Sequence, residues 1–276
     1  MEWNGEKSFS SEEVAGMRIV FASLFLLPLQ IFHASRFNIK KYFLPVFGMG
    51  LFGNLIPAFL FTAAETKINS SLAGMLNALT PLFTILIAVF IFRVKTNWRQ
   101  ITGIGIGFVG ALMLMYFDGG KSGETTAFSY AMLVVAATLC YAISVNIIRR
   151  YLSDLNSVTA AVWAFTMTGP IALLYLLFNT EVISTLSETK NVLPSLSSVA
   201  VLGIAGSAIS VIAFNTLIKN AGAVFASSVT YLMPIVAIVW GLSEAEPVAW
   251  QQVAAIGIIL GAIYLINSKN GSTKSN

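Results

Sequence analysis

The chain has 276 residues, of which 57% are hydrophobic and only 10% are charged, and its mean hydropathy is +0.81. A soluble domain of this size does not tolerate that composition, so lipid is the expected solvent, and one Cys with one His excludes a disulfide framework and a Cys/His metal cluster. The formal charge of +4 comes from basic residues scattered between apolar segments rather than gathered on one face, so we expect no nucleic-acid partner. We also expect no metal and no cofactor.

Nine apolar stretches are each long enough to cross a bilayer core, which takes about 20 helical residues. Backbone groups in lipid must be paired internally, so each stretch is predicted to be a helix. In chain order the predicted spans cover residues 14–32, 43–64, 70–92, 100–117, 127–148, 157–178, 196–218, 223–243 and 248–267. We therefore expect an all-α, polytopic membrane protein without a long soluble domain.

The basic residues predict the orientation of these spans, because Lys and Arg accumulate in cytoplasmic loops. When the loops are assigned alternately to two sides, one side holds 11 of the 16 basic residues and the other holds 4, with Arg18 inside a span. The richer side is predicted to be cytoplasmic, which places the C-terminus inside and the N-terminus outside. The expected location is the cell inner (plasma) membrane.

The span at 70–92 occurs twice in the chain. About 153 residues later the sequence repeats its plan, with Pro234 at the place of Pro81 and Thr230 at the place of Asn77. The preceding span repeats as well, and its matched residues are Gly50, Gly53 and Asn54 with Gly203, Gly206 and Ser207. Duplicated hydrophobic segments are a signature of carrier folds.

This duplication predicts how the chain is divided. Aligning Ser11 with Ser157 places the counterpart of the second half's first helix upstream of Met1, so we expect a ten-helix protein whose first helix is absent from this sequence. Five helices per repeat is an odd number, which makes the two repeats inverted in the membrane. The expected segments are a first repeat with four helices at 1–117, an outer connector at 118–126, a second repeat with five helices at 127–267 and a cytoplasmic tail at 268–276.

Several short motifs occur in order along the two halves. They are Met17-Arg18, Leu79-Thr80-Pro81, Leu232-Met233-Pro234 and Glu246-Pro247, together with glycine-rich closing helices. In these motifs the chain resembles the EamA family of the drug/metabolite transporter superfamily along nearly its whole length. The resemblance implies inverted five-helix repeats around a central cavity for a small-molecule substrate. One departure is Arg93-Val94, which stands where the counterpart of Glu246 is expected.

Arg18 is the one formal charge predicted inside a span, where an unpaired charge costs roughly 3 kcal/mol or more. It lies about four residues, or roughly 6 Å, from the outer end of its helix. Three interpretations stay open: snorkelling to the outer interface, pairing with helix carbonyls or an outer acid, and contact with an anionic substrate.

Polar residues near the middles of the spans are candidates to line the cavity, because polar groups that face lipid are costly. Hydrogen bonding between helices is the alternative for each of them. Trp163 is added as a lining residue from the next helix, although an aromatic near a helix end is often an interfacial anchor. The candidates are Asn54, Asn77, Tyr141, Ser144, Trp163, Ser207, Ser210 and Thr230.

Pro81 and Pro234 each remove a backbone hydrogen bond near a helix centre. A static kink and a moving hinge are both consistent with this position. Because both halves carry a proline at the same point, we expect a hinge that serves alternating access. No Asp or Glu lies near the predicted midplane, so the sequence does not predict a carboxylate proton relay.

These features predict a carrier of small organic metabolites, such as amino acids or related compounds, that alternates access between two inverted repeats. Export is favoured by the resemblance. The expected partners are the substrate and the lipid bilayer, and a homodimer stays open. The alternatives are a non-transporting or truncated membrane protein and a membrane enzyme. We expect no enzyme, because an enzyme would need clustered catalytic acids, histidines or metal ligands.

Overall fold

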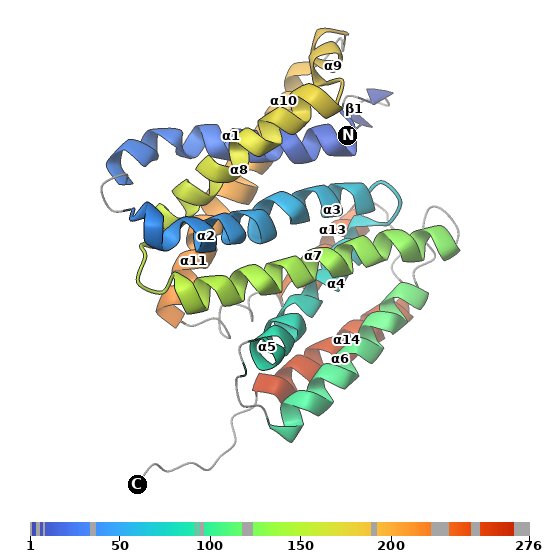
Figure 1. Cartoon of the computed structure of the whole chain (residues 1–276). Helices are drawn as coiled ribbons and strands as arrows, with labels where there is room; N and C mark the ends of the chain where they lie inside the picture. Colours follow the sequence, from blue (N-terminus) through green and yellow to red (C-terminus); the bar gives the residue numbers. More distant parts are fainter. Residues whose placement is uncertain are drawn as a thin grey trace.

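The computed structural model describes residues 2–3, 6–7, 9–33, 37–91, 93, 97–117, 124–188, 192–221, 232–243 and 249–267. These residues are helical apart from their connections and a short hairpin of β1 (Glu2–Trp3) and β2 (Glu6–Lys7). The helices form one bundle, in which α1 and α10 lie at one end and α6 and α14 at the other (Figure 1).

The described first half of the chain forms six α-helices, and two irregular helical segments lie between some of them. Its elements are α1 (Ser11–His33), α2 (Ile39–Gly50), the π-helix η2 (Leu51–Leu55), α3 (Ile56–Ala64), α4 (Ser70–Leu76), the 3-10 helix η3 (Asn77–Leu79), α5 (Thr80–Phe90) and α6 (Trp98–Tyr116). α2, η2 and α3 are continuous, as are α4, η3 and α5.

The second half has a similar order. Its elements are α7 (Glu124–Tyr151), α8 (Ser157–Asn179), α9 (Val182–Glu188), α10 (Val192–Gly203), the π-helix η4 (Ile204–Ile209), α11 (Ser210–Ala221), α13 (Leu232–Ser243) and α14 (Trp250–Asn267). The short helix α9 was not predicted, because its seven residues, VISTLSE, lie outside the apolar stretches.

Six helical segments are long and apolar enough to cross a membrane. They are Ser11–His33, Ile39–Ala64, Ser70–Phe90, Phe128–Tyr151, Ser157–Asn179 and Val192–Ala221. Within the described residues α6, α13 and α14 contain shorter apolar helices. Residues 223–231 of the predicted eighth span and residue 248 of the predicted ninth span lie outside the description. The chain is therefore a multi-pass helical membrane protein, and the count of nine spans stays a prediction.

Helix bounds recur along the chain. α1 and α8 each have 23 residues and begin 146 residues apart, at Ser11 and Ser157. α2 and α10 each have 12 residues and begin 153 residues apart, at Ile39 and Val192. The π-helices η2 and η4 follow them at the same spacing. The two halves thus place regular and irregular helix at matching points.

Two matched pairs of helices pack against each other, α1 with α8 and α6 with α14, the second pair being visible in Figure 1. In the first pair, a Cβ atom on Gly169 would lie 2.2 Å from the Ser23 hydroxyl oxygen. Ser23 and Gly169 are themselves 146 residues apart, so corresponding points of α1 and α8 meet. Small residues at a helix interface allow such close approach, which stabilises helix pairs in lipid by van der Waals packing. The hydrophobic effect does not drive helix association there, because lipid tails are as apolar as the side chains.

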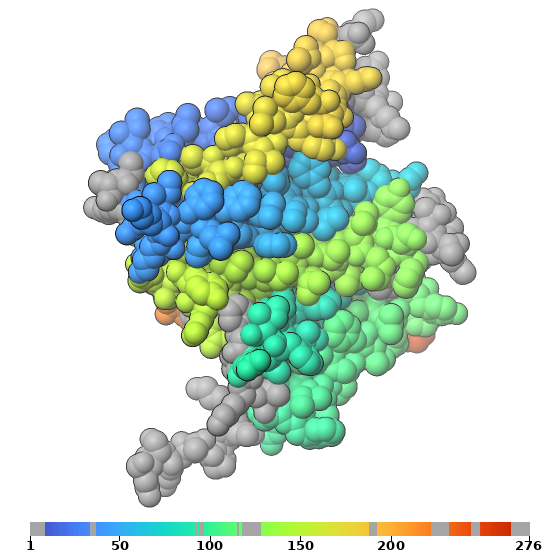
Figure 2. Space-filling model, viewed as in Figure 1, coloured from blue at the N-terminus to red at the C-terminus, as the bar shows by residue number. Residues whose placement is uncertain are grey.

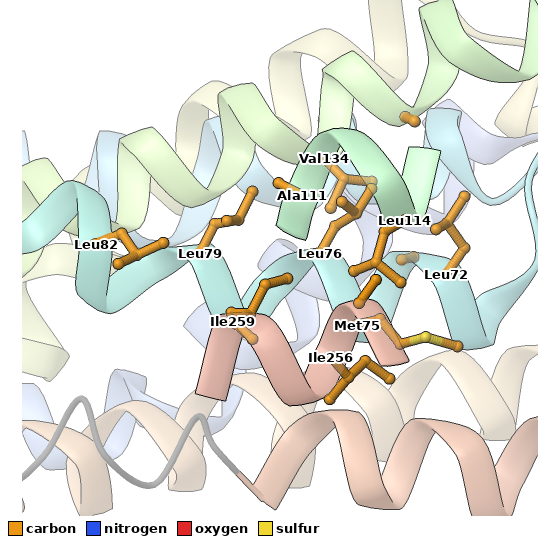
Figure 3. Close-up of a cluster of buried hydrophobic side chains, with 14 of the residues drawn as sticks. Leu72, Met75, Leu76, Leu79, Leu82, Ala111, Leu114, Val134, Ile256 and Ile259 are labelled. Atoms are coloured by element: carbon orange, nitrogen blue, oxygen red, sulfur yellow. The ribbon is translucent and has the colours of Figure 1, made fainter. Parts of the chain in front are cut away.

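The largest apolar cluster surrounds α4 and α5, the most enclosed of the six spans (Figure 3). Its labelled members are Leu72, Met75, Leu76, Leu79, Leu82, Ala111, Leu114, Val134, Ile256 and Ile259. They come from α4, η3, α5, α6, α7 and α14, so this cluster joins the two halves.

The outer surface is also apolar, as a lipid-facing surface should be. Figure 2 shows one face, on which side chains of α2, α3 and α7 form a continuous cover. Many large apolar side chains are exposed, including Phe32, Leu44, Phe90, Phe178, Leu193 and Tyr264. In water such a surface would drive aggregation, whereas in a bilayer it contacts acyl chains.

Candidate functional site

Helix α1 packs against both π-helices, η2 and η4. A π-turn is a wider helical turn that is rare and is found often at functional sites. In η4 the hydroxyl of Ser210 donates to the carbonyl of Ala205, five residues earlier, at 2.7 Å. Ser210 is exposed and uses its hydroxyl to satisfy this local backbone group.

Arg18 of α1 is directed at η4. Its Nε donates to the hydroxyl oxygen of Ser207 at 2.6 Å, across a sequence separation of 189 residues. Ser207 is only 3% exposed, so the guanidinium reaches into the bundle rather than only along the outer end of its own helix. The ion pair that joins two described residues is between Lys41 and Asp154, so no described carboxylate pairs with Arg18.

Asn54 of η2 corresponds to Ser207 in the repeat. Its side chain is 8% exposed and makes no hydrogen bond to another described residue. Beside it, a Cβ atom on Gly53 would lie 2.4 Å from the hydroxyl oxygen of Ser144, so α7 approaches η2 closely. Ser144 donates to the carbonyl of Met49 at 3.3 Å, which ties α7 to α2. Ser144 therefore forms a hydrogen bond between helices, which was the alternative to contact with a solute.

Tyr141 lies one turn before Ser144 on α7 and is half-buried. Its ring packs near that of Phe61 at a centroid distance of 6.0 Å. The charges of Arg18 and Glu65 act on the Tyr141 hydroxyl, so the three side chains lie within electrostatic range. Arg18, Asn54, Tyr141 and Ser207 lie on α1, η2, α7 and η4, of which η2 packs against both α1 and α7 and η4 packs against α1. We call these four residues the α1 cluster.

Asn77 lies at the break between α4 and α5. Pro81 has no N–H to bond the Asn77 carbonyl, and the hydroxyl and the N–H of Thr80 donate to that carbonyl instead, the hydroxyl at 2.8 Å. The Asn77 amide donates to the sulfur of Met233 at 3.0 Å, next to Pro234 of α13. Asn77 therefore connects the two proline-containing segments. Thr230, its counterpart in the repeat, lies outside the described residues.

The structure does not place Trp163 with the α1 cluster. Its ring stacks on Phe37 at a centroid distance of 4.3 Å, in a separate group that includes Tyr42 and Leu155. The Trp163 Nε1 atom is buried and has no hydrogen-bond partner among the described residues.

An ionic contact lies at the same end of the bundle as Trp163. Lys41 pairs with Asp154, which also accepts a hydrogen bond from the Tyr42 hydroxyl at 2.9 Å. The Lys41 ammonium and the Tyr42 hydroxyl hold the pKa of the Asp154 carboxyl below its usual value. This contact connects the beginning of α2 to the turn between α7 and α8.

The opposite end of α1 also carries acids that connect helices. Glu13 accepts a hydrogen bond from the Ser10 N–H at 2.8 Å and one from the Thr185 hydroxyl at 3.1 Å. Glu12 accepts a bond from the Tyr175 hydroxyl at 2.7 Å. The described residues contain no group of three His, Cys, Asp or Glu side chains that could hold a metal ion.

The π-helices were missed by the sequence analysis, although a signal for them exists. Both follow the pattern of two glycines three residues apart and then a polar residue, in Gly50-Leu-Phe-Gly53-Asn54 and again in Gly203-Ile-Ala-Gly206-Ser207. The glycines were recognised as a repeat, but their effect on the helical turn was not predicted.

A multi-pass helical bundle with duplicated helix sets, and with polar and charged residues brought together inside it, is the architecture of secondary carriers. The EamA-like transporter family matches residues 4–116 and 128–268, so the chain belongs to this family. The expected resemblance is thereby confirmed.

Known proteins are similar to the chain over most of its length. An Escherichia coli K12 protein described as the uncharacterized inner membrane transporter YedA is 26% identical over 95% of this chain and 83% of its own. A probable terminal-alkyne amino-acid exporter of Streptantibioticus cattleyicolor is 25% identical over 76% of this chain and 68% of its own. One crystal structure has a TM-score of 0.63 at 15% identity, covering 94% of this chain and 88% of that one, and this likeness shows the fold alone.

Proposed function

We propose that this chain is a carrier that exports small organic metabolites, in particular amino acids or related compounds, across the inner membrane. Membership of the EamA-like transporter family supports transport. The relative from Streptantibioticus cattleyicolor, named as an amino-acid exporter, supports both the substrate class and the direction. In this proposal the chain acts by binding and conformational change and catalyses no chemical reaction.

The proposed mechanism is alternating access by two inverted repeats, at 1–117 and 127–267. The observation that carries it is the pair of π-helices, η2 and η4, which lie at matching points of the two halves and both pack against α1. In a carrier built from two inverted repeats, each repeat adopts in the inward-open conformation the arrangement that the other has in the outward-open conformation. Irregular segments at matching points of both repeats suit this mechanism. Pro81 and Pro234 are the proposed hinges, with Asn77 bonded between their segments.

The proposed topology has nine spans, with the C-terminus in the cytoplasm. It rests on the distribution of basic residues, with 11 of 16 on the side that carries the C-terminus. The contact between Lys41 and Asp154 would then lie at the inner end of the bundle, and Glu12 and Glu13 at the outer end.

The proposed substrate path passes the α1 cluster. Asn54 is a buried amide with no partner among the described residues, and a polar solute would satisfy its hydrogen-bonding groups. Asn77, which bonds to Met233 of α13, extends the path, and Thr230 is proposed as a further lining residue because it matches Asn77 in the repeat. Trp163 would contact the solute near the end that holds Asp154. Ser144 and Ser210 have backbone partners and would contribute less.

The test is a comparison of metabolites in cytosol and medium of bacteria that produce the chain, the Asn77→Leu variant or the Thr216→Val variant. Asn77→Leu removes the bond to Met233 and should abolish redistribution of the transported compound. Thr216→Val is the matched control, because the Thr216 hydroxyl donates only within its own helix, to Ile212 at 2.7 Å. A compound exported by the parent and the control establishes a substrate and a direction.

The opposite result would favour the non-transporting alternative. If membrane insertion is verified and no compound is redistributed by the parent, the chain is not an exporter under these conditions. If the Asn77→Leu variant exports as the parent does, the break at η3 has no part in transport.

A further inference from the structure

Arg18 carries a positive charge within the span Ser11–His33, and it is half-buried. Among the described residues, the acids at the beginning of the same helix are already bonded, Glu12 to Tyr175 and Glu13 to Ser10 and Thr185. A guanidinium at membrane depth is costly unless a negative partner or water stabilises it. Among the described residues Arg18 has no carboxylate bonded to it, although the Glu65 charge acts on the same Tyr141 hydroxyl, and an anionic ligand would complete its hydrogen bonds.

The donors around Arg18 point to the geometry of that ligand. Its Nε is occupied by Ser207 at 2.6 Å, and no described residue accepts a bond from the two terminal nitrogens. Ser207 accepts the bond from Arg18, so its own hydroxyl proton is available to another acceptor. A guanidinium fork beside a hydroxyl donor matches the two oxygens of a carboxylate, which accept parallel hydrogen bonds.

From this arrangement we infer that Arg18 and Ser207 bind the carboxylate of the transported solute. Amino acids are then substrates, and the amines obtained from them by decarboxylation are not. The inference rests on the proposed function, because it names the chemical group that the same path recognises.

The experiment uses the full chain, purified and reconstituted in liposomes that contain an equimolar mixture of L-amino acids and their decarboxylated amines. Release of each compound is followed by mass spectrometry. Arg18→Gln removes the charge, Arg18→Lys keeps the charge but loses the fork, and Thr216→Val is the control. The parent and the control should release at least one amino acid and retain its amine.

Arg18→Gln should lower release of that amino acid by roughly 10- to 100-fold, as expected for loss of charge-assisted hydrogen bonds. Arg18→Lys should give an intermediate rate, because a lysine offers a point charge without the planar fork. A role in helix packing alone would instead lower the release of every transported compound alike.

The outcomes separate this inference from the proposed function. Equal release of an amino acid and its amine by the parent, or unchanged release by Arg18→Gln, overturns the inference and leaves transport standing. Parent liposomes that release no component refute the proposed function itself. If Arg18→Gln is not recovered as a folded protein, competition on the parent decides: excess external amine that inhibits as strongly as the amino acid overturns the inference.

Discussion

Gly203, the last residue of α10 before the π-helix η4, lies close to the backbone of α1. A Cβ atom there would lie 2.7 Å from the Arg18 carbonyl oxygen and 3.0 Å from the Phe21 Cβ. The first contact is with backbone, so one of the two helices must shift in a Gly203→Ala variant. Gly203 has φ −67°, a helical value that alanine adopts without strain. Any loss of stability therefore comes from the steric clash and not from backbone strain.

The magnitude follows from two opposing terms. Overpacking against a fixed neighbour costs about 1–3 kcal/mol, whereas replacing glycine by alanine within a helix gains up to about 1 kcal/mol. Gly257→Ala is the matched control, because a Cβ on Gly257 meets no atom within 4 Å and only the gain applies. We therefore expect Gly203→Ala to be less stable than Gly257→Ala by about 1–3 kcal/mol.

Thermal unfolding of the purified proteins in detergent, followed by size-exclusion chromatography, measures this difference. The Gly203→Ala variant should melt several degrees below the Gly257→Ala variant. It should also transport more slowly, since displacement of either helix lengthens the bond between Arg18 and Ser207. Equal melting temperatures would refute the reasoning, because they would mean that α1 and η4 are not packed as closely as the structure places them.

Two further changes test other parts of the structure. Pro81→Ala adds a backbone N–H that can also donate to the Asn77 carbonyl, which in the parent accepts from Thr80, and it should lower transport several-fold. Stability should change little because Pro81 lies in the first turn of α5. Unchanged transport would exclude a hinge here. Asp154→Asn removes the pair with Lys41, and the lowered pKa of Asp154 sets the pH dependence. Folding lowers the pKa of this carboxyl, so its ionised form stabilises the folded protein at any pH above the unfolded pKa of about 4. This stabilisation is lost as the pH falls through the lower pKa of the folded state. The melting temperature of the parent should exceed that of Asp154→Asn at pH 7 and converge with it in acid, and a difference that persists in acid would contradict this assignment.

Prediction from sequence was most accurate for the spans. The stretch predicted at 157–178 is α8 at Ser157–Asn179, and the stretch at 14–32 is α1 at Ser11–His33. The reason is that lipid leaves a backbone no partner but itself, so an apolar run of this length must be helical. Irregularities within a span were not predictable in the same way, since a π-turn also satisfies the backbone internally and leaves hydropathy unchanged.

The candidate site was predicted less completely. Among the eight cavity candidates, Ser207 bonds to Arg18 of α1 and Asn54 lies on η2, which packs against α1, whereas Trp163 belongs to a different group. Ser144 and Ser210 bond to backbone carbonyls. Hydropathy marks a polar residue in a span without indicating whether its partner is a neighbouring carbonyl, another helix or a solute.

The sequence by itself determined the membrane class, the apolar helices, the duplication and the family, because these depend on local composition and on spacing along one chain. The tertiary structure decided that matched helices α1 and α8 cross at Ser23 and Gly169, and that Arg18 meets Ser207 from 189 residues away. These contacts depend on how helices are rotated and how closely they approach, which is set by side-chain packing between distant segments. For that reason the binding chemistry proposed for Arg18 became visible only after the helices were placed together.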